Sequence, residues 1–163
     1  MAGIPLYATA VLPEWIDYNG HLRDAYYALI VSLATDALMD RIGLDAEYRG
    51  RTHCTLYTVE LHIHYLHEVR QSDQLSVLVR IVAADHKRIH AAFEILRAGH
   101  EPPAATAEVM LLHVCQQDDG ARTAPFPPAV AAALTALQTA SAGMPATGPG
   151  SRRLELRGHG RSA

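Results

Sequence analysis

The feature that most constrains the fold is a set of four segments in which apolar and polar residues alternate. The segments span residues 57–65, 75–81, 89–95 and 105–111, and turn-forming residues separate them at 71–73, 85–87 and 99–103. In the first segment the apolar positions are Tyr57, Val59, Leu61, Ile63 and Tyr65. Alternation with one apolar face is typical of an antiparallel sheet that packs on one side. The pattern therefore predicts four antiparallel strands whose apolar face must be covered.

One long helix is predicted upstream of these strands, from Leu22 to about Ile42. Its apolar residues recur at helical intervals, at Leu22, Ala25, Tyr26, Leu29, Leu33, Ala37 and Leu38. Gly43 stands where a helix C-terminus is expected. Some 20 residues make a helix of roughly 30 Å, which can cross a small sheet. Residues 5–12 read as a further strand ended by Pro13, and residues 45–55 as an irregular segment. The predicted class is α+β, with five to six antiparallel strands around one long helix.

The C-terminal region is predicted to add one short helix and a tail. Pro125, Pro127 and Pro128 precede an Ala- and Leu-rich helix at about 129–138. After Gly143 the chain is rich in Gly, Pro, Ser and Arg, which indicates flexibility, with residues 153–157 as a candidate short edge strand. We therefore expect one domain over residues 1–142 and a mostly flexible tail over residues 143–163.

Composition excludes several classes of protein. The 163 residues are 49% hydrophobic and 19% charged, with a net charge of −3, which argues against nucleic acid or an anionic membrane as the main partner. No apolar run approaches the ~18 residues of a membrane span, and no signal peptide is recognised. The two cysteines, Cys54 and Cys115, show no metal-ligand spacing. These features predict a cytoplasmic protein with reduced thiols.

Candidate catalytic residues lie in the loop that leads into the long helix. This loop holds Asp17, Asn19, Gly20 and His21. A helix N-terminus presents free backbone N–H groups and the positive end of the helix dipole, so a nearby carboxylate suits an enzyme that attacks a carbonyl. We interpret Asp17 as a nucleophile or general base and the amides from Gly20 to about Asp24 as oxyanion donors. Asn19 and His21 would position water or the carboxylate. The alternative is that these residues only form a turn or fix the loop.

At this point the chain resembles a known family. The resemblance is to hotdog-fold acyl-CoA thioesterases of the 4-hydroxybenzoyl-CoA type, and more closely to betainyl-CoA thioesterases of carnitine breakdown. It is carried by the runs at residues 15–21, 25–27, 34–38, 57–60, 85–90 and 107–114. It implies a hotdog fold, hydrolysis of a short acyl-CoA with Asp17 as the catalytic carboxylate, and no cofactor, because CoA is part of the substrate. Relatives often carry two Asn residues after the His, where this chain has Arg23 and Asp24.

A cationic acyl group would be held by aromatic faces and negative charge. The candidate substrate-binding residues are Trp15, Tyr18, Asp24, Tyr26, Tyr27, Tyr57 and Glu60. Lys87 and Arg88, at a predicted hairpin tip, are candidates for binding CoA phosphate, although basic turn residues are more often only solvated. Glu60, His62 and His64 share a strand face and have metal-binding chemistry, but a mixed polar face turned to solvent or to another subunit is the favoured interpretation, so no metal site is predicted.

Two other functions stay open from sequence alone. Hotdog hydratases use Asp-x-Asn-Pro-x-His; Asp17 and Asn19 match its start, but Gly20 replaces the Pro and His21 comes one residue early. A non-catalytic acyl-CoA binding module is the second alternative. We also expect a homodimer or homotetramer, because an open edge strand is usually paired or protected.

Overall fold

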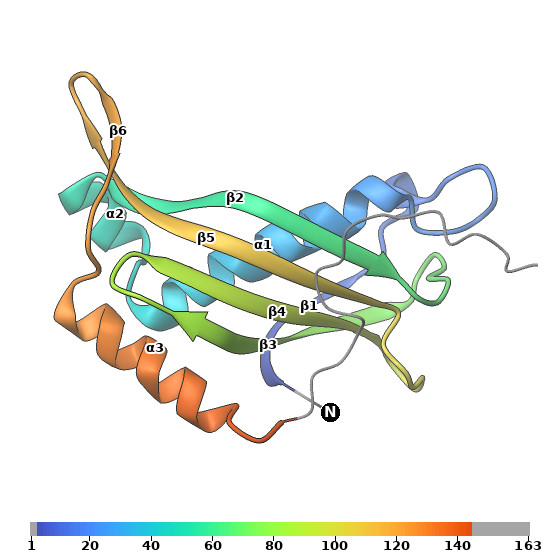
Figure 1. Cartoon of the computed structure of the whole chain (residues 1–163). Helices are drawn as coiled ribbons and strands as arrows, with labels where there is room; N and C mark the ends of the chain where they lie inside the picture. The colour runs from blue at the N-terminus through green and yellow to red at the C-terminus, as the bar shows by residue number, and fades with distance from the viewer. Residues whose placement is uncertain (1–2, 145–163) are drawn as a thin grey trace, which may run out of the picture.

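The computed structural model describes residues 3–144, which form one sheet, one buried helix and two peripheral helices (Figure 1). The strands are β1 (Ile4–Ala10), β2 (Cys54–Tyr65), β3 (Gln74–Ala84), β4 (Arg88–Arg97), β5 (Ala105–Gln117) and β6 (Gly120–Thr123). The helices are α1 (Asp24–Ile42), α2 (Ala46–Thr52) and α3 (Pro128–Ala140), with a 3-10 turn, η1, at Pro13–Trp15. No helix among residues 3–144 is both long and apolar enough to cross a membrane.

The sheet is antiparallel, with the order β1-β3-β4-β5-β2, and β6 pairs with the end of β5. It curls around α1, so the predicted α+β hotdog arrangement is confirmed (Figure 1). β1 and β2 are the two edge strands of this order. The loop before α1 lies at one end of the sheet, and α2 and the β5–β6 hairpin lie at the other (Figure 1).

Helix α1 is confirmed, but its buried stripe differs in part from the one predicted. The side chains turned to the core are Tyr27, Ile30, Val31, Ala34, Thr35, Leu38, Met39 and Ile42. They follow one another at intervals of three and one, which is one face of a helix. The predicted stripe also included Leu29 and Leu33, which lie on a second apolar stripe of the helix. Leu29 is 39% exposed and Leu33 is half-buried. Both stripes have helical periodicity, so the sequence could not show which one the sheet covers. Gly43 ends α1 with a φ of 86°, as its position predicted.

A β-bulge in β2 reverses the predicted side-chain alternation of that strand. The register with β5 shifts between Thr58 and Glu60, so Val59 is the additional residue. Leu61 then pairs with the core residue Val109, whereas Tyr57 pairs with Leu112 on the opposite face of the sheet. The expectation that Tyr57 shares a face with Tyr65 is therefore wrong, because one inserted residue changes the face of every residue before it.

The peripheral segments agree with the sequence in part. α3 confirms the expected C-terminal helix, and Val130, Leu134 and Leu137 bury its inner face. The expected irregular segment at 45–55 is instead the short helix α2, whose first turn Asp45 caps by accepting the Tyr48 N–H at 2.8 Å. Most of the predicted tail, with the candidate strand at 153–157, lies outside the described residues.

The two cysteines are paired, so the prediction of reduced thiols does not hold in this structure. Cys54 of β2 lies directly opposite Cys115 of β5, with a Cα–Cα distance of 3.9 Å, and a disulfide joins them. The residues are 61 positions apart, and only the register of the two strands brings them together. The prediction of a cytoplasmic location is a separate one and stays a prediction.

Replacing Leu38 by Ala should lower the free energy of unfolding by about 2–5 kcal/mol, because its fully buried side chain fills the centre of the core. Urea denaturation followed by circular dichroism measures the change. Leu12, which is 40% exposed, gives the matched control, and Leu12→Ala should change stability by about 0.5 kcal/mol or less. Equal effects of the two substitutions would contradict the proposed core.

Candidate active site

Asp17 organises the loop that precedes α1. Its Oδ1 accepts the backbone N–H of Asn19 at 2.8 Å and that of His21 at 3.1 Å. The backbone closes the same turn, since the N–H of Asp17 donates to the His21 carbonyl at 2.9 Å and that of Gly20 to the Asp17 carbonyl at 3.1 Å. Gly20 has a φ of 81°, which favours glycine at this position. The turn and the carboxylate therefore hold each other in place.

The same hydrogen bonds lower the pKa of Asp17 below its ordinary value of 3.8. The largest cause is the His21 backbone N–H, followed by a smaller opposing effect of burial and then by donors from Asn19. A carboxylate that accepts backbone N–H groups is stabilised in its charged form. Asp17 is therefore ionised at neutral pH and carries the charge that a base or nucleophile needs.

The structure narrows the expected set of oxyanion donors. The amides of Gly20 and His21 donate to Asp17, that of Leu22 to the Val69 carbonyl at 2.7 Å, and that of Arg23 to the Trp15 carbonyl at 2.9 Å. These bonds build the loop, so the amides are not available to a substrate. The N–H of Ala25 is held only by the adjacent Asp24 carboxylate, at 2.9 Å. The amides of Asp24 and Ala25, at the start of α1, are therefore the members of the expected set that the loop backbone does not use.

A cleft of about 400 Å³ adjoins Asp17. It is lined by the loop and start of α1 on one side and by the segment after β2 on the other, with Asp17, His21, Leu22, Arg23, Asp24, Tyr27, Tyr65, Leu66, His67, Glu68 and Val69. Tyr27 and Tyr65 meet edge to face, with ring centroids 5.1 Å apart. Burial raises the pKa of Tyr27 to about 12, so both the ring and its hydroxyl are uncharged. The cleft thus combines two aromatic rings with three carboxylates, those of Asp17, Asp24 and Glu68.

His21 connects the two sides of the cleft. Its Nε2 lies 3.1 Å from Oε2 of Glu68, and its backbone pairs with Arg70 in an isolated bridge. Arg97 holds the far side by donating from a guanidinium N–H to the Glu68 carbonyl at 3.0 Å. His21 precedes α1 instead of lying on it, so it does not take the helical position expected of a hydratase histidine. Its contacts hold the loop against the segment that follows β2.

The predicted aromatic residues are only partly brought together. Tyr27 lines the cleft, whereas Trp15 is buried and stacks on Tyr26 at 5.4 Å behind the loop. The two stacked rings support the loop, and neither residue lines the cleft. Tyr18 is 95% exposed at the loop tip. Trp15, Tyr18 and Tyr26 are therefore not on the cleft surface of this chain.

The remaining predicted residues lie away from Asp17 within one chain. Tyr57 and Glu60 are on the outer face of β2, and Tyr57 is eight residues from Tyr65, or roughly 25 Å at ~3.3 Å per residue. Lys87 and Arg88 are at the opposite end of the sheet, where the Lys87 carbonyl accepts the His113 N–H at 2.8 Å. Arg88 pairs with Asp85 at 2.7 Å. Their predicted roles in substrate and CoA binding stay predictions.

Sequence reasoning missed the far wall of the cleft. Leu66, His67, Glu68 and Val69 follow β2 and have no local motif, and tertiary bonds, including those from Leu22 and His21, place them at the site. The alternation of β2 predicts that Tyr65 faces the helix, but it does not indicate a role for Tyr65 in the site. On the outer face, His62 pairs with Glu60 at 2.6 Å and His90 with Glu108 at 3.0 Å, in agreement with a mixed polar surface.

The curled sheet, the buried helix and the carboxylate at its N-terminus define a hotdog-type thioesterase. The family model described as "Thioesterase-like superfamily" matches residues 11–134. The chain therefore belongs to this superfamily and is an acyl-CoA thioesterase.

Particular relatives are similar over most of the chain. The betainyl-CoA thioesterase of Pseudomonas aeruginosa is 45% identical over 139 residues, which is 85% of this chain and 86% of that protein. The L-carnitine dehydrogenase/betainyl-CoA thioesterase of Agrobacterium fabrum is 43% identical over 129 residues, which is 79% of this chain but only 26% of that longer protein.

Solved structures agree with this assignment. A protein of Pseudomonas putida KT2440, assigned as a thioesterase, superposes with a TM-score of 0.84 and 43% identity, covering 97% of this chain and 99% of that one. A Staphylococcus aureus protein in complex with CoA gives a TM-score of 0.83 at 26% identity, covering 96% and 98% of the two chains.

Asp17→Asn should reduce turnover of an acyl-CoA by about 10²–10⁴-fold, because the amide keeps an oxygen at Oδ1 for the loop but cannot act as a base. Release of free CoA, followed with a thiol reagent, measures the rate. Asp36→Asn, at an exposed position of α1, is the control and should leave the rate unchanged.

The pH profile of kcat/KM checks the same assignment. The base form of Asp17 exists above its pKa, and that pKa is lowered, so the acid limb should fall below about pH 4 while circular dichroism shows that the fold persists. A near wild-type rate in Asp17→Asn would transfer the role to His21. An acid limb near pH 6.5, where an ordinary imidazole titrates, would point the same way.

Proposed function

We propose that the chain hydrolyses betainyl-CoA to glycine betaine and CoA, with Asp17 as nucleophile or general base. The observation that carries this proposal is the composition of the cleft, in which the Tyr27 and Tyr65 rings accompany the carboxylates of Asp17, Asp24 and Glu68. The names of the two curated relatives described above support the same substrate.

The cationic acyl group explains why such a cleft is suitable. A trimethylammonium group neither donates nor accepts conventional hydrogen bonds, so aromatic faces and diffuse negative charge are the means to hold it. Cation–π contacts in a desolvated site contribute up to ~2 kcal/mol. The cations that line the cleft are Arg23 and, when protonated, His21 and His67, and His21 is paired with Glu68. Negative charge and ring faces thus favour a cation over a neutral acyl group.

The chemical step requires few groups because a thioester is already activated. Asp17 would attack the carbonyl carbon directly or remove a proton from an attacking water. The first amides of α1, together with the positive end of this 19-residue helix, would stabilise the oxyanion. The CoA thiolate leaves readily, since thiol pKa values are near ~8.5.

Residues beside the cleft suggest where the phosphates of CoA bind. A neighbouring hollow of about 640 Å³ shares Leu66, His67 and Glu68 with the catalytic cleft and adds Arg70, Asp73, Arg97 and His100. Arg70 is exposed, and its ion pair with Glu68 is long, at 3.7 Å. Its guanidinium therefore remains accessible to an anion. Within one chain, Arg70 is a better placed phosphate ligand than Lys87 or Arg88, which an adjacent subunit would have to supply.

The exposed edge of β2 supports assembly as a homodimer. Its apolar side chains Tyr57, Val59, Leu61 and Tyr65 are 37–55% exposed. Among the described strands, β2 pairs only with β5, so its outer edge retains free backbone groups. Antiparallel pairing of two β2 strands about a two-fold axis would bury this surface on both chains. It would also bring residues 54–60 of one chain toward the Tyr65 end of the other, beside its cleft.

Val59→Lys should convert the dimer to a monomer, because it places a charge at the centre of this edge. Light scattering coupled to size exclusion measures the mass. Ala132→Lys, on the exposed face of α3, is the control and should leave the mass unchanged. A wild-type protein that is monomeric and fully active at micromolar concentration would refute the shared site.

The substrate proposal predicts a preference for positive charge at constant shape. The value of kcat/KM should be at least about tenfold higher for betainyl-CoA than for 3,3-dimethylbutanoyl-CoA, in which carbon replaces the nitrogen, because about 1.4 kcal/mol corresponds to tenfold. Tyr65→Leu should reduce this ratio, and Tyr65→Phe, which keeps the ring, should preserve it.

Equal values for the two esters would discard the cationic substrate while leaving thioester hydrolysis intact. Failure of Tyr65→Leu to change the ratio would remove Tyr65 from the binding site.

A further inference from the structure

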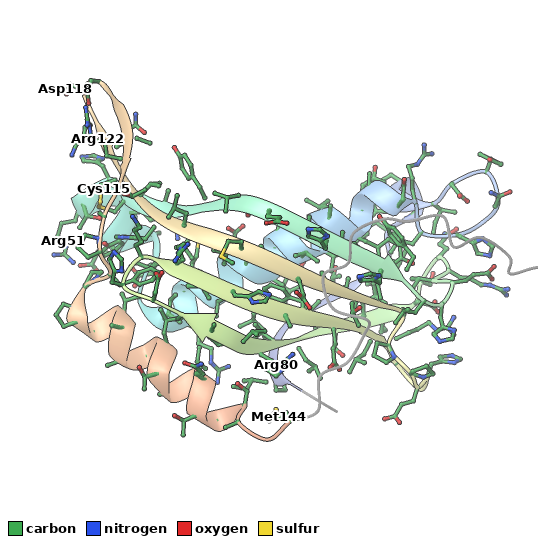
Figure 2. All side chains as sticks on the ribbon, in the orientation of Figure 1. Arg51, Arg80, Cys115, Asp118, Arg122 and Met144 are labelled. Atoms are coloured by element: carbon green, nitrogen blue, oxygen red, sulfur yellow. A yellow bond between two sulfur atoms is a disulfide. The ribbon has the colours of Figure 1, made fainter. Side chains whose placement is uncertain are left out.

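A second group of reactive side chains lies at the end of the sheet farthest from Asp17. Cys54, His113 and Cys115 place one ligand atom each within 4.8 Å of one another. Cys54 and His113 are 7% and 1% exposed, and Cys115 is half-buried. Cys54 of β2 lies opposite Cys115 of β5, and His113 is two residues before Cys115 on β5. The cluster is near α2 and the base of the β5–β6 hairpin, where Figure 2 shows Cys115 close to Arg51. Among residues 3–144, these three are the His, Cys, Asp or Glu side chains that form a group close enough to hold a metal ion.

We propose that these three residues form a zinc site when the Cys54–Cys115 disulfide is reduced. Two thiolates and one imidazole are ligands typical of Zn²⁺, and the remaining tetrahedral position can be taken by water. Tetrahedral Zn–S bonds of about 2.3 Å put ligand atoms roughly 3.7 Å apart, a spacing that the cluster can reach by side-chain rotation. Two thiolates neutralise the charge of the ion, which suits a site of low exposure.

The hydrogen bonds of His113 are those of a ligand histidine. Its Nδ1 lies 2.9 Å from the Ala124 carbonyl, so Nδ1 carries the proton and donates it. This leaves the lone pair on Nε2, which now accepts from the Tyr48 hydroxyl at 3.1 Å. A backbone carbonyl on the distal nitrogen fixes the ring orientation and tautomer of many metal-bound histidines. Zinc would replace only the Tyr48 hydroxyl as the partner of Nε2.

A cleft beside the cluster gives the ion a path and a place for its fourth ligand. This cleft has a volume of about 400 Å³ and is lined by Cys54, His113 and Cys115 together with Tyr48, Arg51 and Ala124, among others. The space is distinct from the catalytic cleft, which shares no lining residue with it. The inference is therefore independent of the proposed substrate.

The chemistry balances in two steps. A dithiol reductant supplies two electrons and two protons to the Cys54–Cys115 bond and itself becomes a cyclic disulfide, leaving two thiols on the protein. Zn²⁺ then displaces both thiol protons, which pass to the buffer, and forms two Zn–S bonds and one Zn–N bond. The two sulfur atoms can therefore either form the disulfide or bind the metal ion, but not both at once.

The test uses the full chain, reduced with dithiothreitol, desalted without oxygen and titrated with Co²⁺ as a spectroscopic probe. One equivalent per chain should give a thiolate-to-cobalt charge-transfer band together with the intense visible bands of a tetrahedral ion, and Zn²⁺ should abolish both. The unreduced protein should give neither. Competition with a chromophoric chelator then measures the affinity for Zn²⁺.

Matched variants assign the ligands. Cys54→Ser and Cys115→Ser should each weaken zinc binding by at least about a hundredfold, whereas Tyr48→Phe, which removes the competing hydroxyl, should bind no more weakly than the wild type. Circular dichroism confirms that each variant is folded. The proposal is overturned if the reduced wild type shows no thiolate band, or if the serine variants bind zinc as tightly as the wild type, which would transfer the metal to the other histidines.

Discussion

The burial of α1 within the curled sheet is the constraint on which the geometry of the candidate site depends. Ile30, Ala34 and Leu38 have no exposed surface, so the helix cannot shift along or away from the strands without opening the core. This fixes the position of the helix N-terminus in space. The position of the first turn of α1, and of the loop before it, follows from this packing.

In the loop, the bonds that hold Asp17 in place also set its charge. Asp17 stabilises its turn through Oδ1, and the same bonds keep it ionised. The turn uses the amides of Gly20 to Arg23, so these four are not offered to a substrate.

The sequence was sufficient for the features that depend on local order and insufficient for those that depend on register. The strands, the long helix, its Gly43 end and the Asp17 loop were predictable because alternation, periodicity and turn chemistry are local. The far wall of the cleft at Glu68 was not, since only tertiary hydrogen bonds bring it to His21. The Cys54–Cys115 pair was missed for the same reason, because nothing local specifies which residues of two strands lie opposite.

The bulge at Val59 has a consequence for comparing this chain with its relatives. On either side of it, β2 presents opposite sets of alternate residues to α1, so a position is defined by its distance from the bulge as well as by its number. An alignment that places a one-residue gap anywhere else in the strand would equate core residues with surface residues. Tyr57 and Tyr65, which look equivalent by spacing, would then be assigned the same role, although the sheet separates them.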